Sequence, residues 1–79
     1  MTRLSLSDAL SKAHYFVILD PYGPYGEWGS FRPLKVEFEE SKGKWIVVCT
    51  FKKGAKEVKA RITIDDEKGV IVGYEELEG

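Results

Sequence analysis

Residues 34–51 read LKVEFEESKGKWIVVCTF, and residues 58–64 read VKARITI. In both stretches apolar residues alternate with charged or polar ones, which is the pattern of a β-strand that buries one face. Residues 45–51 are an exception because they are apolar on both faces apart from Thr50, as expected of a central strand. Short connections separate these stretches from each other and from a last apolar run near the end of the chain. The sequence therefore predicts a four-stranded antiparallel meander over residues 34–76.

The predicted turns also set which residues share a face. Lys42-Gly43 and Lys53-Gly54 are predicted as two-residue turns, and residues 65–69 as a longer turn before the last strand. With these turns one apolar set from all strands falls on the same face, and a slip of one residue would move a strand's whole set to the other face. We expect Trp45 to be buried in this set. Its members are Leu34, Val36, Phe38, Trp45, Val47, Cys49, Phe51, Val58, Ala60, Ile62, Ile64, Val70, Val72 and Tyr74.

A helix is predicted before the sheet, within residues 5–19. Ser5 and Asp8 have the spacing of a capping box, in which each side chain bonds the backbone N–H of the other residue. Asp20-Pro21 ends the helix, because the residue before a proline is pushed out of the α region. The stripe formed by Leu6, Ala9, Leu10, Ala13 and Val17 recurs at helical spacing. It can be buried against the apolar face of the sheet, so the predicted fold class is α+β, with one N-terminal helix packed on a four-stranded antiparallel meander sheet.

Length and composition exclude several classes of protein. The 79 residues are enough for a single domain, residues 1–79. One cysteine excludes an internal disulfide and a four-cysteine zinc site. The net charge of −1 lacks the basicity that is typical of proteins binding nucleic acid.

Two further features bear on location and source. No apolar run approaches the roughly 20 residues of a membrane span, and residues 1–5 lack the apolar centre of a signal peptide. We therefore expect a cytoplasmic protein without membrane association. The sequence has no Asn or Gln and is rich in Lys and Glu, a composition that favours a thermophilic source.

The order of these elements resembles a known family. A helix starting SLSDALSKA at residues 5–13 precedes a hairpin that contains WIVV at residues 45–48, and the chain then reads RITIDDEKGVIVGYE over residues 61–75. This last stretch resembles the V-x-V-D-x-x-x-G-x-[VI] ending of PepSY-type domains, small modules with a helix on a sheet. Members of that family are usually extracytoplasmic modules linked to peptidases and their control. The resemblance covers residues 5–19 and 34–76, and we take from it the fold.

Residues 20–33 form a loop with an unusual aromatic pattern. It contains four successive triplets, PYG, PYG, EWG and SFR, with Tyr22, Tyr25, Trp28 and Phe31 in their middle positions. In a polyproline-type helix, which has three residues per turn, these aromatic residues would line one edge. Such an edge could bind a peptide or stack on bases or sugar rings. Alternatively, the aromatic residues could fold back and cover the rim of a small core. The loop is the best candidate for the surface that binds a protein or peptide partner.

A second candidate surface is basic. Residues 42–61 contain Lys42, Lys44, Lys52, Lys53, Lys56, Lys59 and Arg61 against one acidic residue, Glu57. Together with the aromatic loop, these side chains could contact phosphates, so a nucleic-acid-binding accessory protein is the alternative function. Most of them lie at or beside the predicted turns, where lysine is an ordinary solvated residue, and the strands lack the aromatic-glycine signature of RNA-binding sheets. Nucleic acid is therefore the less favoured partner.

Catalysis and metal binding have little support in the sequence. Cys49 and His14 are the one plausible nucleophile–base pair, but Cys49 is predicted on the core face, where a thiolate does not form readily. The acidic residues of the turn at residues 65–67 lack the ligand spacing of a calcium loop. We therefore expect a protein that is not an enzyme, with no cofactor and no metal: a small interaction or regulatory module.

The face of the sheet away from the helix is the predicted site of self-association. The predicted registers leave Ile46, Val48 and Ile71 on this outer face, inside a frame of charged residues. An apolar centre with a polar rim is the anatomy of a protein interface, and a two-fold contact is the commonest way to bury it. The sequence thus suggests a homodimer through the outer face, with the sheet edges as the competing route.

Overall fold

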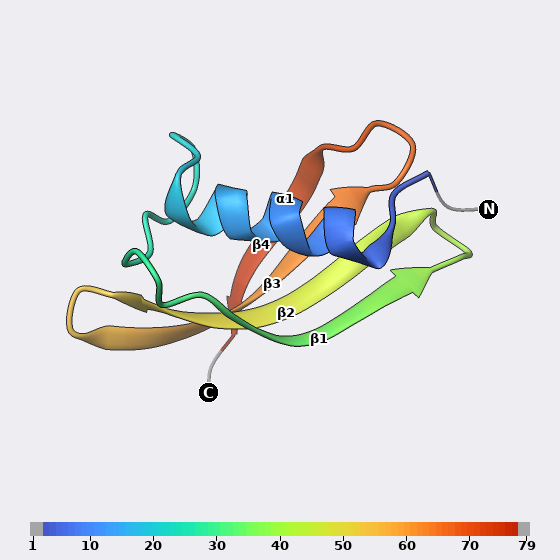
Figure 1. Cartoon of the computed structure of the whole chain (residues 1–79). Helices are drawn as coiled ribbons and strands as arrows, with labels where there is room; N and C mark the ends of the chain where they lie inside the picture. The colour runs from blue at the N-terminus through green and yellow to red at the C-terminus, as the bar shows by residue number, and fades with distance from the viewer. Residues whose placement is uncertain (1–2, 78–79) are drawn as a thin grey trace.

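Within residues 3–77, the computed structural model has one helix and four strands. The sheet is antiparallel with strand order β1-β2-β3-β4, and α1 lies across one of its faces (Figure 1). The elements are α1 (Leu6–Ile18), β1 (Arg32–Glu39), β2 (Lys44–Lys53), β3 (Lys56–Asp65) and β4 (Ile71–Leu77). The predicted helix on a four-stranded meander is confirmed. In this part of the chain no helix is long and apolar enough to cross a membrane.

Helix α1 begins with the predicted capping box. The Ser5 hydroxyl accepts a hydrogen bond from the backbone N–H of Asp8, and the Asp8 carboxylate accepts one from the backbone N–H of Ser5, both at 3.0 Å. These bonds stabilise the ionised carboxylate and lower the pKa of Asp8 below its ordinary value. At the other end, the backbone N–H of Leu19 donates to the carbonyl of Tyr15 at 2.8 Å. The last helical residue, Ile18, is one position before the predicted end.

The core lies between α1 and the sheet. Strands β2 and β3 contribute most of its sheet residues, because β1 and β4 are edge strands with one neighbour each. Trp45 is 7% exposed, as predicted. The buried apolar residues are Ala9, Ala13, Phe16, Val17, Ile18, Trp45, Val47, Cys49, Phe51, Ala60, Ile62 and Ile64.

The hairpin registers differ from the predicted ones by two residues. Val36 pairs with Val47 instead of Cys49, because residues 40–43 form the first turn. Cys49 pairs with Ala60 instead of Val58, because the second turn is at residues 54–55. A shift of two residues keeps every side chain on its face, since strand side chains alternate with a period of two. The predicted faces of β2 and β3 are therefore right although the predicted partners are wrong.

Bulges change the predicted faces at one end of each edge strand, whereas Val36, Phe38 and Tyr74 pack against the core as predicted. In β1 the pairing shifts between Pro33 and Lys35, and Leu34 is 57% exposed. In β4 the pairing shifts so that Gly73 pairs with Thr63 and Ile71 pairs with Ile64. Ile71 consequently packs against the core, whereas Val70 and Val72 are exposed. The prediction that Ile71 lies on the outer face is wrong, because an extra residue in a strand exchanges the faces beyond it.

One buried carboxylate ties three parts of the chain together. Asp66 is the buried charged residue of the core region, at 5% exposure. Its carboxylate accepts hydrogen bonds from the backbone N–H groups of Arg3 and Leu4 at 2.8 and 3.0 Å. The indole N–H of Trp45 donates to the same carboxylate at 2.8 Å. The segment before α1, strand β2 and the β3–β4 turn thus meet at Asp66.

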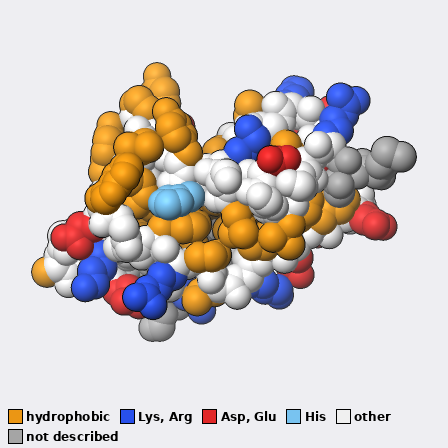
Figure 2. All heavy atoms as spheres, viewed as in Figure 1, with side chains coloured by type: hydrophobic (Ala, Val, Ile, Leu, Met, Phe, Trp, Pro, Cys, Tyr) orange, Lys and Arg blue, Asp and Glu red, His pale blue; other side chains and the backbone are white. Residues whose placement is uncertain are grey.

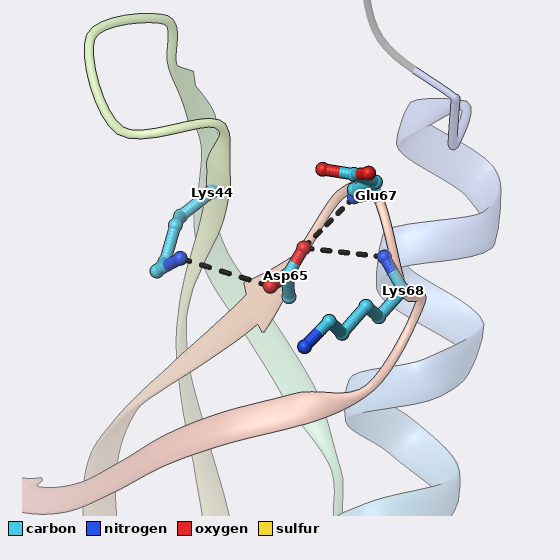
Figure 3. A network of polar contacts seen from close by, with 4 residues as sticks. All are labelled: Lys44, Asp65, Glu67 and Lys68. Atoms are coloured by element: carbon cyan, nitrogen blue, oxygen red, sulfur yellow. Dashed lines mark hydrogen bonds and ion pairs between the residues drawn. The ribbon is translucent and has the colours of Figure 1, made fainter.

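The neighbouring acidic residue, Asp65, shapes the β3–β4 turn (Figure 3). One of its carboxylate oxygens accepts from the backbone N–H groups of Glu67 and Lys68 at 2.9 and 3.2 Å. The other oxygen lies 3.9 Å from the Lys44 ammonium. Asp65 and Asp66 therefore serve two separate networks, and both act as structural groups of the turn.

Replacing Trp45 tests the importance of the core. Trp45→Ala should lower the free energy of unfolding by about 3–5 kcal/mol, because it removes a large buried ring and leaves a cavity. Trp28→Ala is the matched control: Trp28 is 79% exposed, so its removal should change stability by about 0.5 kcal/mol or less. Urea denaturation followed by circular dichroism measures both. Equal losses for the two variants would contradict this placement of Trp45.

Asp66 predicts how stability depends on pH. Burial would raise the pKa of Asp66, but hydrogen bonds from Leu4, Arg3 and Trp45 outweigh burial and hold it below the ordinary value of 3.8. Since the folded state binds the proton more weakly than the unfolded state, the stabilisation is present above pH 3.8 and is lost as the pH falls towards the folded pKa. Thermal melts between neutral and acid pH should show Asp66→Asn as less stable at neutral pH and less sensitive to acid than the unmodified protein. Glu67→Gln, at an exposed carboxylate of the same turn, should leave the acid profile almost unchanged.

Candidate functional site

Glycines hold the loop between α1 and β1 against the rest of the fold. A Cβ at Gly23 would clash with the backbone carbonyl of Phe16, and a Cβ at Gly26 would lie 2.9 Å from the Phe51 ring and 3.0 Å from a Val17 methyl. The backbone N–H of Gly26 donates to the Val17 carbonyl at 2.8 Å, which fixes the loop to the end of α1. The backbone N–H of Glu27 also donates to the Lys52 carbonyl at 2.7 Å. The loop is therefore tied to both α1 and β2.

Three of the four predicted aromatic residues project from this loop. Tyr22, Tyr25 and Trp28 are 93%, 62% and 79% exposed. Tyr25 has a φ of 56°, which is rare for a bulky residue and rules out a continuous polyproline helix through the loop. The Tyr25 hydroxyl donates to the carbonyl of Pro21 at 2.9 Å. Gly23 and Gly26 face the fold, and the aromatic residues beside them project away from it.

Phe31 differs from the other three. It is half-buried, packs against the core and stacks on His14, with ring centroids 4.8 Å apart and planes 7° from parallel. The residue covers the rim of the core, which was the alternative interpretation of the whole loop. Phe31 therefore does not belong to the exposed aromatic set, and the predicted line of four aromatic residues is wrong at this position.

Two hollows flank the last turns of α1, and Tyr15 lines both. The first, of about 300 Å³, lies between α1 and Trp28 and is lined mainly by apolar side chains, including Ile18 and Leu19. The second, of about 670 Å³, lies between α1 and the start of β4 and includes Tyr22 and Val70. Four large exposed residues of α1 and the loop line these hollows, and we call them the aromatic surface: Tyr15, Leu19, Tyr22 and Trp28. Figure 2 shows hydrophobic side chains gathered in a ridge at this end of the molecule.

The sequence did not indicate the helical members of the aromatic surface. Tyr15 and Leu19 are both more than half exposed, and neither belongs to the apolar stripe that predicts the buried face of α1. An apolar residue outside such a stripe is the one signal that could have identified Tyr15. That the loop would return to this part of the helix depends on the contacts of Gly23 and Gly26, which the sequence pattern does not reveal.

Most of the basic residues of positions 42–61 are spread along the outer face of the sheet, where acidic side chains are interspersed with them. Lys42, Lys44 and Arg61 line one hollow of this face, and Lys52 and Lys59 lie on the same face further along β2 and β3. Lys42 and Lys44 lie at the β1–β2 end of the sheet, where they are 3.7 and 3.9 Å from carboxylate oxygens of Glu39 and Asp65. Arg61 forms an ion pair with the Glu75 carboxylate on β4. The remaining lysines are Lys52, Lys53, Lys56 and Lys59, towards the β2–β3 turn at the other end of these strands.

Cys49 and His14 occupy different environments. Cys49 is fully buried, and burial raises the pKa of its thiol to about 11. At neutral pH the thiol therefore remains protonated and packs as a small apolar group. His14 is on the exposed surface of α1, where its ring stacks on Phe31. Each residue has a structural role in this arrangement.

The outer face of the sheet retains two of its three predicted apolar residues. Ile46 and Val48 are half-buried on β2 and line a shallow hollow of about 530 Å³. Charged side chains surround them, including Lys35, Glu37 and Arg61. Ile71 does not belong to this face, because it packs against the core.

Comparisons with protein-family models, with curated proteins and with solved structures found no match for this chain. The resemblance to PepSY-type domains therefore stays a prediction from the sequence, and functional inference depends on the geometry of the surfaces.

Gly23 provides a test of how the loop is held. Gly23→Ala should lower the free energy of unfolding by about 3 kcal/mol, because the added methyl group must displace the backbone carbonyl of Phe16. Gly54→Ala is the matched control: it has open space around the new methyl group but a φ of 65°, and should cost about 1 kcal/mol. Urea denaturation compares the two. A cost for Gly23→Ala no greater than that for Gly54→Ala would contradict the close contact.

Proposed function

We propose that the protein is a small non-enzymatic interaction module that binds a protein or peptide partner through the aromatic surface. The observation that carries this proposal is the exposure of Tyr22 and Trp28 on a loop whose backbone is fixed to α1 and β2. Large aromatic side chains lose apolar hydration when they are covered, and tyrosine and tryptophan are enriched at the centres of protein interfaces. Their exposure therefore favours a surface that is covered by a partner.

The attachment of the loop supports binding with little rearrangement. Gly23 and Gly26 leave no space between the loop and the fold, and hydrogen bonds fix Gly26 and Glu27 to neighbouring elements. A surface that is ordered before binding loses less conformational entropy when the partner arrives. The aromatic side chains thus project from a backbone that is fixed in place.

The shape of the surface favours an extended peptide segment. Tyr15 stands between the two hollows, so successive side chains of one extended segment could occupy both. Extended segments rich in proline commonly bind grooves lined by aromatic residues, because such segments have little conformational entropy to lose. We therefore expect a partner that presents apolar or proline side chains in an extended conformation.

One observation favours the alternative, nucleic-acid binding. Trp28 also lines a hollow of about 570 Å³ with Arg32 and Lys52, an arrangement in which a base could stack beside basic groups. However, Glu27 and Glu57 line the same hollow and offset the positive charge. A protein or peptide is therefore the favoured partner.

Selection from a random-peptide display library tests the proposal. Peptides selected on the unmodified protein should bind the double variant Tyr15→Ser, Trp28→Ser at least about tenfold more weakly, since contacts at interface centres carry most of the binding energy. Both side chains are exposed, so the variant should fold normally. Isothermal titration calorimetry with the selected peptides measures the loss.

Val72→Ser is the matched control, because Val72 is exposed on β4 outside the aromatic surface. It should leave the affinity of the selected peptides unchanged. Failure to select any peptide, or equal binding to the double variant, would reject the proposal. Salt-sensitive binding of a single-stranded oligonucleotide that is lost in Arg32→Glu, Lys52→Glu would support the alternative instead.

A further inference from the structure

Strand β1 has a free side along the edge of the sheet. It pairs with β2 on one side, and among residues 3–77 no segment pairs with its other side. A free edge leaves alternate backbone N–H and C=O groups available to another strand. In Figure 1 this edge lies along the side of the sheet opposite β4.

Two opposite charges stand next to each other on the outer face of this edge. Lys35 and Glu37 are two residues apart, so they share a face of β1, and their side chains are 63% and 52% exposed. The ammonium and carboxylate lie 3.6 Å apart within the strand. A second copy of β1 running antiparallel would present the same two charges in reverse order.

We propose that two copies of the protein pair through their β1 edges, antiparallel, with Val36 opposite Val36 of the second copy. In this register Lys35 of each copy lies opposite Glu37 of the other, which gives two cross-strand pairs of opposite charge. A shift by two residues in one direction places Lys35 opposite Lys35, and a shift by two in the other places Glu37 opposite Glu37. A shift by one residue would set inward side chains against outward ones. The charge pattern therefore selects one register.

An apolar band above the same edge favours the same pairing. Leu6, Leu10 and His14 are spaced by four residues and lie on one side of α1, and His14 contacts Phe31, which leads into β1. On this side of α1, Leu6 is 52% exposed. Figure 2 shows the hydrophobic side chains as a band between α1 and β1. Pairing of the β1 edges would bring two such bands together beneath the two helices.

The other edge and the outer face fit a second copy less well. Strand β4 contains Glu75 and Glu76 and no basic residue, so an antiparallel copy of itself would provide no opposite charge. In the hollow of the outer face, Ile46 and Val48 are lined up with charged and polar residues only. The β1 edge alone combines free backbone groups, an apolar band and charges that match their own reversed copy.

Reversing either charge of the Lys35–Glu37 pair tests the proposed dimer interface. Lys35→Glu and Glu37→Lys each place like charges in both cross-strand pairs, and each should weaken dimerisation about tenfold or more in analytical ultracentrifugation. A mixture of the two single variants restores opposite charges, so it should form a heterodimer that neither variant forms with itself. Lys56→Glu makes the same charge reversal at an exposed residue at the start of β3 and should leave dimerisation unchanged. Circular dichroism checks that each variant is folded.

Three results would overturn the proposal. The first is an unmodified protein that remains monomeric at high micromolar concentration. The second is a mixture of Lys35→Glu and Glu37→Lys that contains no heterodimer. The third is a dimer that survives both single variants but is lost in Ile46→Lys, Val48→Lys, which would assign the interface to the outer face of the sheet.

Discussion

The carboxylate of Asp66 is the polar contact that fixes the helix to the sheet. Burying a charge is costly unless hydrogen bonds replace its hydration, and here three N–H groups from Arg3, Leu4 and Trp45 do so. Because Arg3 and Leu4 immediately precede the capping box of α1, the carboxylate sets where the helix begins relative to β2. Apolar packing of the α1 stripe is less directional and does not by itself specify this position.

The sequence pattern predicted which face of the sheet the residues of β2 and β3 occupy, but it did not predict which residues pair between strands. Period-two alternation in β2 and β3 is strong, and any shift by two residues preserves it, so the predicted core survived the wrong turn positions. The bulges in β1 and β4 were not predictable, because nothing in the alternation shows that Leu34 and Val72 would be left out of the pairing. Asp65 and Asp66 were likewise indistinguishable in the sequence, although one shapes a turn on the surface and the other is buried.

The aromatic surface was also predictable only in part. The triplet pattern correctly indicated exposure of Tyr22, Tyr25 and Trp28, but the polyproline conformation that was to produce it is interrupted at Tyr25. In the structure Gly23 and Gly26 face the fold, and the lack of space for a Cβ there is a property of the packed structure. Which residues of α1 join the aromatic surface depends on where the loop packs against the helix. Long-range contacts decide this position, and local sequence patterns do not show them.

The connectivity of the chain separates the contacts that can form early in folding from those that we expect to form later. Each hairpin of the meander joins strands that are neighbours in sequence, and closing such short loops takes little entropy. The bond from Leu4 to Asp66 instead joins residues that are 62 positions apart, so it closes a much longer loop than any hairpin turn does. We therefore expect the sheet to assemble hairpin by hairpin and the segment before α1 to attach later.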